Sequence, residues 1–174
     1  MNALLNIPIH PVRKLTLVVT TNKEHANITE LIAALSLRGP LYILAGSDWL
    51  PSYALTRIIR HRTHEVKQTL NHIHTARAFT CYQLLDLIAN LRPDEEPLLI
   101  LDFLNTFQDD DIPLPVRFRV LRQCCEHLQK LAFRKPVIVL TQNDESFLSI
   151  LQHSADEVLY IETEPEQVHQ PILF

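Results

Sequence analysis

The clearest candidate for a functional residue in this sequence is an aspartate at the end of an apolar stretch. The stretch Leu98–Phe107, LLILDFLNTF, runs from four aliphatic residues into Asp102. A carboxylate in this position can lie beside a magnesium ion and a bound nucleotide, provided that a glycine-rich loop upstream holds the phosphates. That loop has the pattern G-x-x-x-x-G-K-[ST], because its glycines let backbone amides approach the phosphates and its lysine neutralises their charge. The segments before Asp102 must therefore be inspected for such a loop.

Short apolar runs alternate with helical patterns along the chain. We expect strands at 14–20, 41–45, 73–75, 97–102, 135–142 and 156–163, and helices at 27–37, after Pro51, at 81–91 and at 116–133. The strands are continuously apolar, and helices separate most of them, which is typical of a parallel sheet covered on both faces. The sequence therefore predicts an α/β fold with a mostly parallel sheet and helices on both faces.

Length and composition indicate one intracellular domain. The chain has 174 residues, a net charge of -4 and 47% hydrophobic residues, which suffices for one full core. We expect a core at about 14–163, a short segment 1–13 and a tail 164–174. The three cysteines show no metal-type spacing and favour a reduced chain, and no apolar run approaches the length of a spanning helix. The expected location is the cytoplasm, without a membrane contact.

Four stretches together resemble the ATPase core of the RecA and RadA recombinases. They are LYILAGSDWLPSYAL from Leu41, HIHTARAFTCYQLL from His72, LLILDFL from Leu98 and LQKLAFRKPVIVLTQ from Leu128. The second is similar to a segment of the archaeal and eukaryotic branch through Ala76, Arg77, Ala78, Phe79 and Gln83. The third looks like the Walker B strand, and the fourth ends in a Thr-Gln pair like the one that faces the nucleotide. The resemblance covers most of the chain and implies a RecA-like fold.

Measured against that family, the phosphate loop is degenerate. The corresponding segment is TTNKEHANIT, with Asn22, Asn27, Ile28 and Thr29 where the two glycines, the lysine and the hydroxyl residue belong. The family's water-activating glutamate corresponds to Gly46, with Asp48 as an imperfect substitute. The resemblance leaves Thr29, Asp102 and Gln142 as a vestigial nucleotide pocket. We therefore expect no catalytic residue, no ATP hydrolysis and no cofactor, and Asp102 has the alternative of capping a helix or accepting backbone amides.

Arginines form the candidate DNA contacts. They are Arg57, Arg60, Arg62, Arg117 and Arg119. Against this interpretation, exposed helices often carry such charges, and the chain has no overall basic excess. The resemblance places DNA-binding loops after the fourth and fifth strands, but here the first is NTFQDDDIPLP, whose aspartates repel phosphates, and the second is at best NDESFLS. We expect DNA binding by this chain alone to be weak.

Apolar residues near both ends and one tryptophan are the candidate partner contacts. They are Ile7 and Ile9 in NIPIH, Trp49, and Ile172, Leu173 and Phe174 in the final PILF. NIPIH could add to the sheet edge of a neighbour and PILF could dock in a groove, whereas Trp49 could equally close the core. Histidine pairs such as His72 and His74 have no evident third ligand, so no metal site is expected. For Cys124 and Cys125, a buried apolar role is favoured over a nucleophilic one.

Three functions fit these features. The first is a non-catalytic RecA-fold accessory factor that binds a recombinase, a RecA-fold paralogue or a second copy of itself and assists DNA recombination or repair. The second is a regulatory interaction protein similar to the SulA type of cell-division inhibitor, with no role on DNA. The third is a nucleotide sensor or ATPase with an altered pocket around Asp48, Asp102 and Gln142. A retained fold does not decide among them, because function depends on the site.

Overall fold

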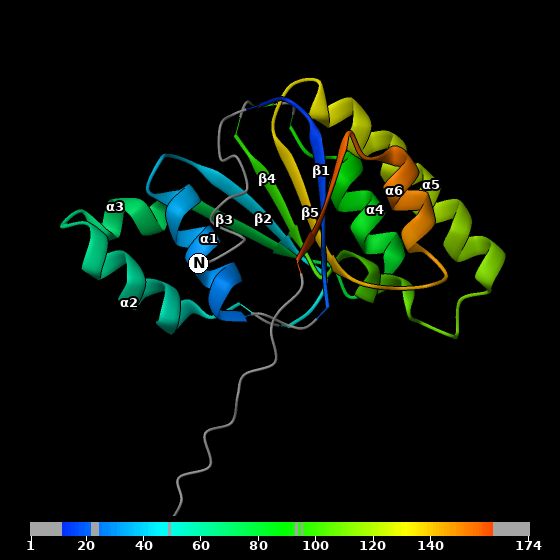
Figure 1. Cartoon of the computed structure of the whole chain (residues 1–174), viewed down its shortest axis with the longest axis horizontal. Helices are drawn as coiled ribbons and strands as arrows, with labels where there is room; N and C mark the ends of the chain where they lie inside the picture. Colours follow the sequence, from blue (N-terminus) through cyan, green and yellow to red (C-terminus); the bar gives the residue numbers. More distant parts are fainter. Residues whose placement is uncertain (1–11, 22–24, 49, 93, 95, 162–174) are drawn as a thin grey trace, which may run out of the picture.

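One parallel sheet forms the centre of the molecule. The computed structural model describes residues 12–21, 25–48, 50–92, 94 and 96–161. The six strands lie in the order β3-β2-β4-β5-β1-β6, and every neighbouring pair is parallel (Figure 1). They are β1 (Leu15–Thr20), β2 (Leu41–Ala45), β3 (Ile73–Arg77), β4 (Leu98–Leu101), β5 (Val137–Gln142) and β6 (Glu157–Ile161). The predicted strands are all present, so the expectation of a parallel sheet is confirmed.

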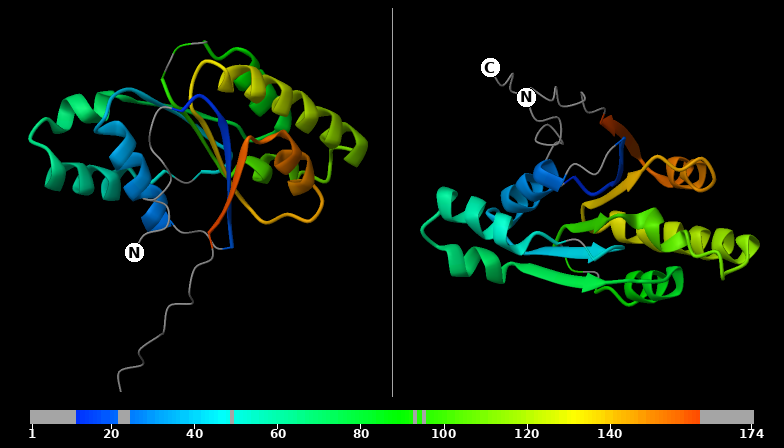
Figure 2. Two further views of the ribbon diagram at one scale, coloured as in Figure 1. Left: turned by 45° about the horizontal axis from the view of Figure 1, so that its top comes forward. Right: turned by 90° about the horizontal axis from the view of Figure 1, so that it is seen from below.

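Helices cover both faces of the sheet, as predicted. On one face lie α1 (His25–Ser36), α2 (Ser52–Arg62) and α3 (Val66–Asn71). On the other face lie α4 (Cys81–Ala89), α5 (Leu114–Ala132) and α6 (Leu148–Ser154). Figures 1 and 2 show the two groups of helices on opposite sides of the strands. The arrangement is α/β and is consistent with a RecA-like fold.

Two apolar layers hold the helices against the strands. Within β4, Leu98 and Ile100 face the layer of α4, α5 and α6, whereas Leu99 and Leu101 face the layer of α1, α2 and α3. Successive side chains of a strand point to opposite faces, so a strand covered on both sides needs apolar residues at every position. The continuous aliphatic run of β4 follows from this double burial. None of the described helices has the length and apolarity required to cross a bilayer.

Three short elements were not predicted from the sequence. They are α3, α6 and the 3-10 helix Phe103–Phe107. The 3-10 helix occupies the start of the segment expected to be the first DNA-binding loop, and its Phe103 and Phe107 are fully buried. The segment expected to be the second such loop, 143–149, turns within a few residues into α6. Each segment is anchored to the core at one point, the first by Thr106 and Phe107 and the second by Phe147 and Leu148, which are buried.

Candidate functional site

The carboxyl edge of the sheet is where a parallel α/β fold places a ligand. β2 leads into α2 on one face, whereas its neighbour β4 leads toward α5 on the other. Neighbouring strands whose connections leave on opposite faces open a crevice at their carboxyl ends. Gly46 and Ser47 follow β2 at this crevice, and Asp102 and Asn105 follow β4. Asp102, which the sequence singled out, therefore stands where the topology favours a site.

Contacts within the chain fill this crevice. Ser47 Oγ donates to Asp102 Oδ2 at 2.5 Å, and Asn105 Nδ2 donates to the Gly46 carbonyl oxygen at 2.9 Å. The backbone N–H of Gly46 donates to the Leu101 carbonyl oxygen at 2.8 Å. A Cβ atom at position 46 would lie only 2.4 Å from the Asp102 carbonyl oxygen, so this approach requires glycine. Little space is left between the ends of β2 and β4 for a ligand.

Asp102 also has an unusual backbone. Its φ of 51° and ψ of 42° lie in the left-handed region, which aspartate and asparagine tolerate better than most residues. The residue is half-buried, and the bond from Ser47 turns one carboxylate oxygen toward β2. The side chain makes no cap to the 3-10 helix that follows it. Its observed partner is thus a hydroxyl, where the sequence suggested a helix cap or backbone amides.

The cavity beside Asp102 lies between the ends of β4 and β5. Its volume is about 190 Å³, and its lining residues are Asp102, Leu104, Asn105, Gln108, Thr141, Gln142, Asn143 and Asp144. Asp102 and Gln142, both predicted for a nucleotide pocket, meet here. Asp144 Oδ2 accepts from Gln108 Nε2 at 2.5 Å, and Asp144 Oδ1 accepts from the backbone N–H groups of Ser146 and Phe147. Among the described residues, no lysine or arginine lines this cavity, so its charge repels a triphosphate.

Three of the positions aligned with a phosphate loop lie in the first turns of a helix, and Asn22, the fourth, is outside the described residues. α1 begins at His25, before Asn27, Ile28 and Thr29. Ile28 packs in the apolar layer between α1 and the sheet, and Thr29 is buried at 2% exposure. Thr29 is not among the residues that line the cavity of Asp102 and Gln142. A buried isoleucine in place of the lysine brings no positive charge to a phosphate.

Asp48, the proposed substitute for a catalytic carboxylate, is on the surface. Its side chain is 81% exposed, and its Oδ1 atom lies 3.2 Å from Arg77 Nη1 at the carboxyl end of β3. An exposed ion pair of this kind contributes little to stability. Asp48 is not among the residues that line the cavity of Asp102.

The arginines predicted to bind DNA divide into several groups. Arg57 and Arg60 are exposed on α2, and Arg119 is exposed on α5 on the opposite face of the sheet. Arg62 is hydrogen-bonded to Glu30 and therefore has its charge compensated. The prediction for Arg117 is not supported, because its side chain is only 12% exposed.

Arg117 instead joins three neighbouring segments. Its Nη1 atom donates to the Phe107 carbonyl oxygen at 3.0 Å, and its guanidinium lies 5.8 Å from the centre of the Phe147 ring. Its Nη2 atom also lies 3.5 Å from Asp110. These contacts tie α5 to the segment after β4 and to the turn before α6. Arg117 is therefore a packing residue.

The predicted partner contacts at Ile7, Ile9, Trp49, Ile172, Leu173 and Phe174 lie outside the described residues. Within the described part, two aromatic side chains that follow β3 are exposed, Phe79 at 63% in the turn after the strand and Tyr82 at 49% in the first turn of α4. Phe79 belongs to a motif noted in the sequence, but nothing in the motif indicates its exposure. An exposed large aromatic pair next to a sheet edge is a feature of interaction sites.

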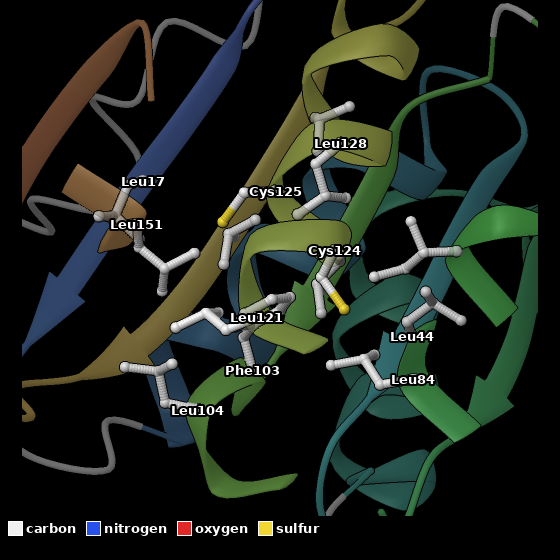
Figure 3. Packing of buried hydrophobic residues seen from close by; sticks show 14 of the residues in the cluster. Leu17, Leu44, Leu84, Phe103, Leu104, Leu121, Cys124, Cys125, Leu128 and Leu151 are labelled. Atoms are coloured by element: carbon white, nitrogen blue, oxygen red, sulfur yellow. The ribbon is translucent and has the colours of Figure 1, made fainter. Parts of the chain in front are cut away.

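The cysteines are part of the core. Cys81, Cys124 and Cys125 are all buried and free, and burial raises the pKa of each thiol. Figure 3 shows Cys124 and Cys125 pointing apart, the first toward Leu84 and the second toward Leu151. Because the thiolate is disfavoured, neither residue is suited to act as a nucleophile. No group of three or more His, Cys, Asp or Glu residues that could hold a metal occurs in the described ranges.

The sequence matches no protein-family model. A search of curated proteins likewise gives no match. Any functional conclusion must therefore come from the fold, the carboxyl edge and the exposed surfaces.

Proposed function

We propose that this protein is a non-catalytic, cytoplasmic accessory factor with a RecA-like fold, which binds a recombinase or a RecA-fold paralogue and assists DNA recombination or repair. The observation that carries the proposal is the composition of the carboxyl edge. Ile28 and Thr29 occupy α1 where a phosphate loop would have its lysine and hydroxyl, and both are buried. The cavity beside Asp102 offers carboxylates and amides. These features do not favour nucleotide binding. We therefore assign the function to the surface of the protein, where a partner can bind.

The surface best suited to a protein partner is the open edge at β3. β3 is hydrogen-bonded to β2 alone among the described strands, so the backbone groups on its other side face outward. Such an edge can accept an extended segment of another chain, whose main-chain hydrogen bonds supply affinity. His74, Thr75 and Arg77 on this strand are exposed, and the strand contains no proline, so each of its residues has a backbone N–H. The edge is therefore available for a partner.

Phe79 and Tyr82 add side-chain specificity beside that edge. The backbone N–H of Phe79 donates to Gln83 Oε1 at 2.8 Å, and the backbone N–H of Gln83 donates to Thr80 Oγ1 at 3.2 Å. These reciprocal bonds resemble a capping box and fix the turn that leads into α4. An aromatic residue on a fixed turn loses little conformational entropy on binding. Phe79 is thus the residue expected to anchor a partner.

Binding of a purified recombinase to the full chain tests this proposal. We expect Phe79→Ser with Tyr82→Ser to weaken the complex by about 30-fold or more, since one aromatic anchor such as Phe79 contributes about 2 kcal/mol or more. Biolayer interferometry gives the affinities. The matched control is Phe133→Ser with Tyr160→Ser, which removes an even more exposed Phe and Tyr from other surfaces and should leave the affinity unchanged.

Other results would change the surface or the partner that we propose. Binding that is unchanged in the Phe79 and Tyr82 variant would remove this surface from the interaction. A complex with a purified cytoskeletal GTPase, and none with the recombinase, would favour the SulA-like alternative. Self-association would show as a mass that rises with concentration in sedimentation experiments, and the same double substitution should then abolish it.

A second candidate function rests on the cavity itself. Asp102 and Gln142 line one cavity, and this supports the alternative function of a nucleotide sensor with an altered pocket. The absence of a lining lysine or arginine in the described part of the chain counts against a triphosphate. A direct binding measurement distinguishes the two functions. Only a nucleotide sensor must bind ATP and magnesium saturably, whereas the accessory factor need not.

A further inference from the structure

The exposed side of α2 carries a basic hollow that is separate from the site at the carboxyl edge of the sheet. Its lining residues are Ser52, Tyr53, Thr56, Arg57 and Arg60, around a volume of about 350 Å³. Positions 53, 56, 57 and 60 have the spacing of a single helical face. The opposite face of α2 carries Leu55 and Ile59, which are buried against the sheet. The hollow therefore faces away from the core, and Figure 1 shows α2 with α3 at one end of the molecule.

Among the described residues, the two arginines of the hollow have no acidic partner. Neither the Arg57 nor the Arg60 side chain takes part in a hydrogen bond or an ion pair within the described part of the chain, whereas Arg62 of the same helix is bonded to Glu30. Like charges three residues apart on a helix repel each other. This repulsion would be relieved by an anion that both guanidinium groups contact, and guanidinium groups bind phosphate in two-pronged hydrogen bonds.

Tyr53 gives the hollow an aromatic surface. Its side chain is 84% exposed, the largest exposure among the large apolar side chains of the described residues. Thr56 Oγ1 donates to the Ser52 carbonyl oxygen at 2.7 Å, which leaves the oxygen of that hydroxyl as an acceptor. An exposed ring beside unpaired arginines matches the composition of sites for single-stranded nucleic acid, where bases stack on aromatic rings and arginines hold the backbone.

Charge is also concentrated around the hollow. The segment 52–71 contains Arg57, Arg60, Arg62 and Lys67 against the single acidic residue Glu65, although the chain as a whole has a net charge of -4. His61 and His64, both exposed, lie in the same segment. Such a local excess steers a polyanion to one end of an acidic protein.

We propose that the α2 hollow binds single-stranded nucleic acid, with Arg57 and Arg60 on neighbouring phosphates and Tyr53 stacked on a base. The proposal extends the proposed accessory function, but it uses a different surface from Phe79 and Tyr82. The experiments on nucleic-acid binding and on recombinase binding can therefore refute one proposal without refuting the other. A nucleic-acid site on this chain would let it act on the strand that its partner holds.

Fluorescence anisotropy of a labelled single-stranded oligothymidylate with the full chain at low salt tests the site. We expect Arg57→Glu with Arg60→Glu to abolish measurable binding, and Arg57→Gln with Arg60→Gln to lower the slope of log K against log salt by about 1.4, which corresponds to two lost phosphate contacts on a single strand. Tyr53→Ala should weaken binding about tenfold, whereas Tyr53→Phe should retain it, because stacking needs the ring alone.

The control is Arg122→Glu with Arg134→Glu, an equal charge change at two exposed arginines in and just after α5. It should leave most of the affinity intact. An equal loss in this control, or no binding by the unmodified chain, would overturn the proposal. A polyglutamate peptide that competes as well as the oligonucleotide would also overturn it and would assign the hollow to an acidic protein segment.

Discussion

Phe107→Ala is expected to lower the free energy of unfolding by about 4 kcal/mol, within the range found for large aromatic residues truncated in a core. Phe107 is fully buried, and its ring centre lies 5.6 Å from that of Phe103 and 5.9 Å from that of Phe147. Truncation removes these aromatic contacts and leaves a cavity that the rigid sheet cannot fill. Urea denaturation at constant pH measures the change.

The matched control for this prediction is Phe133→Ala. Phe133 is 79% exposed at the end of α5, so its loss should change the stability by less than about 0.5 kcal/mol. A change below about 1 kcal/mol in Phe107→Ala would mean that the 3-10 helix Phe103–Phe107 is loosely attached. In that case Asp102, which directly precedes this helix, would not be held in place either.

Gly46→Ala is expected to cost about 3 kcal/mol of stability, at the upper end of overpacking effects. The added Cβ atom would lie 2.4 Å from the Asp102 carbonyl oxygen and 3.1 Å from its carbonyl carbon. Both atoms belong to the backbone, so β2 and β4 must separate at their carboxyl ends. The bond from Asn105 Nδ2 to the Gly46 carbonyl oxygen would be lost with that movement. Thermal unfolding followed by circular dichroism measures the loss.

A double variant identifies which neighbouring atom causes the loss of stability in Gly46→Ala. The Cγ2 atom of Thr106 is the third near neighbour of the added Cβ, at 3.2 Å. Thr106→Ser removes this methyl group and keeps the hydroxyl that donates to the Phe103 carbonyl oxygen. We expect Gly46→Ala with Thr106→Ser to be no more stable than Gly46→Ala alone. Recovery of most of the stability would show that the methyl group, and not the backbone of Asp102, fills the crevice.

Elements whose pattern reflects local burial could be predicted from the sequence. β4 is an example, because all four of its residues are buried and a strand covered on both faces must be apolar at each position. α6 could not be recognised in the same way. It has seven residues, and only Leu148 and Leu151 are buried, which is too short a pattern to distinguish a helix from a turn. Its position depends on packing against distant parts of the chain.

The candidate site was harder to predict, because it depends on contacts between distant segments. Asp102 was located correctly at the end of a strand, but its bond to Ser47 links residues 55 positions apart. Arg117 looked like a surface charge in the sequence, yet its contacts with Phe107 and Phe147 bury most of its side chain. Charge alone predicts exposure only on average, since arginine can bury its stem and stack its guanidinium on aromatic rings.

Titration calorimetry of the full chain with ATP and magnesium is the most direct test of a RecA-like core that binds no triphosphate. The matched variant is Asp102→Asn, which tolerates the left-handed backbone and can accept the bond from Ser47, but lacks the carboxylate charge. We expect no saturable heat at millimolar ATP with either protein. Saturable binding by the unmodified chain that Asp102→Asn abolishes would contradict this and would identify the cavity as a working nucleotide site.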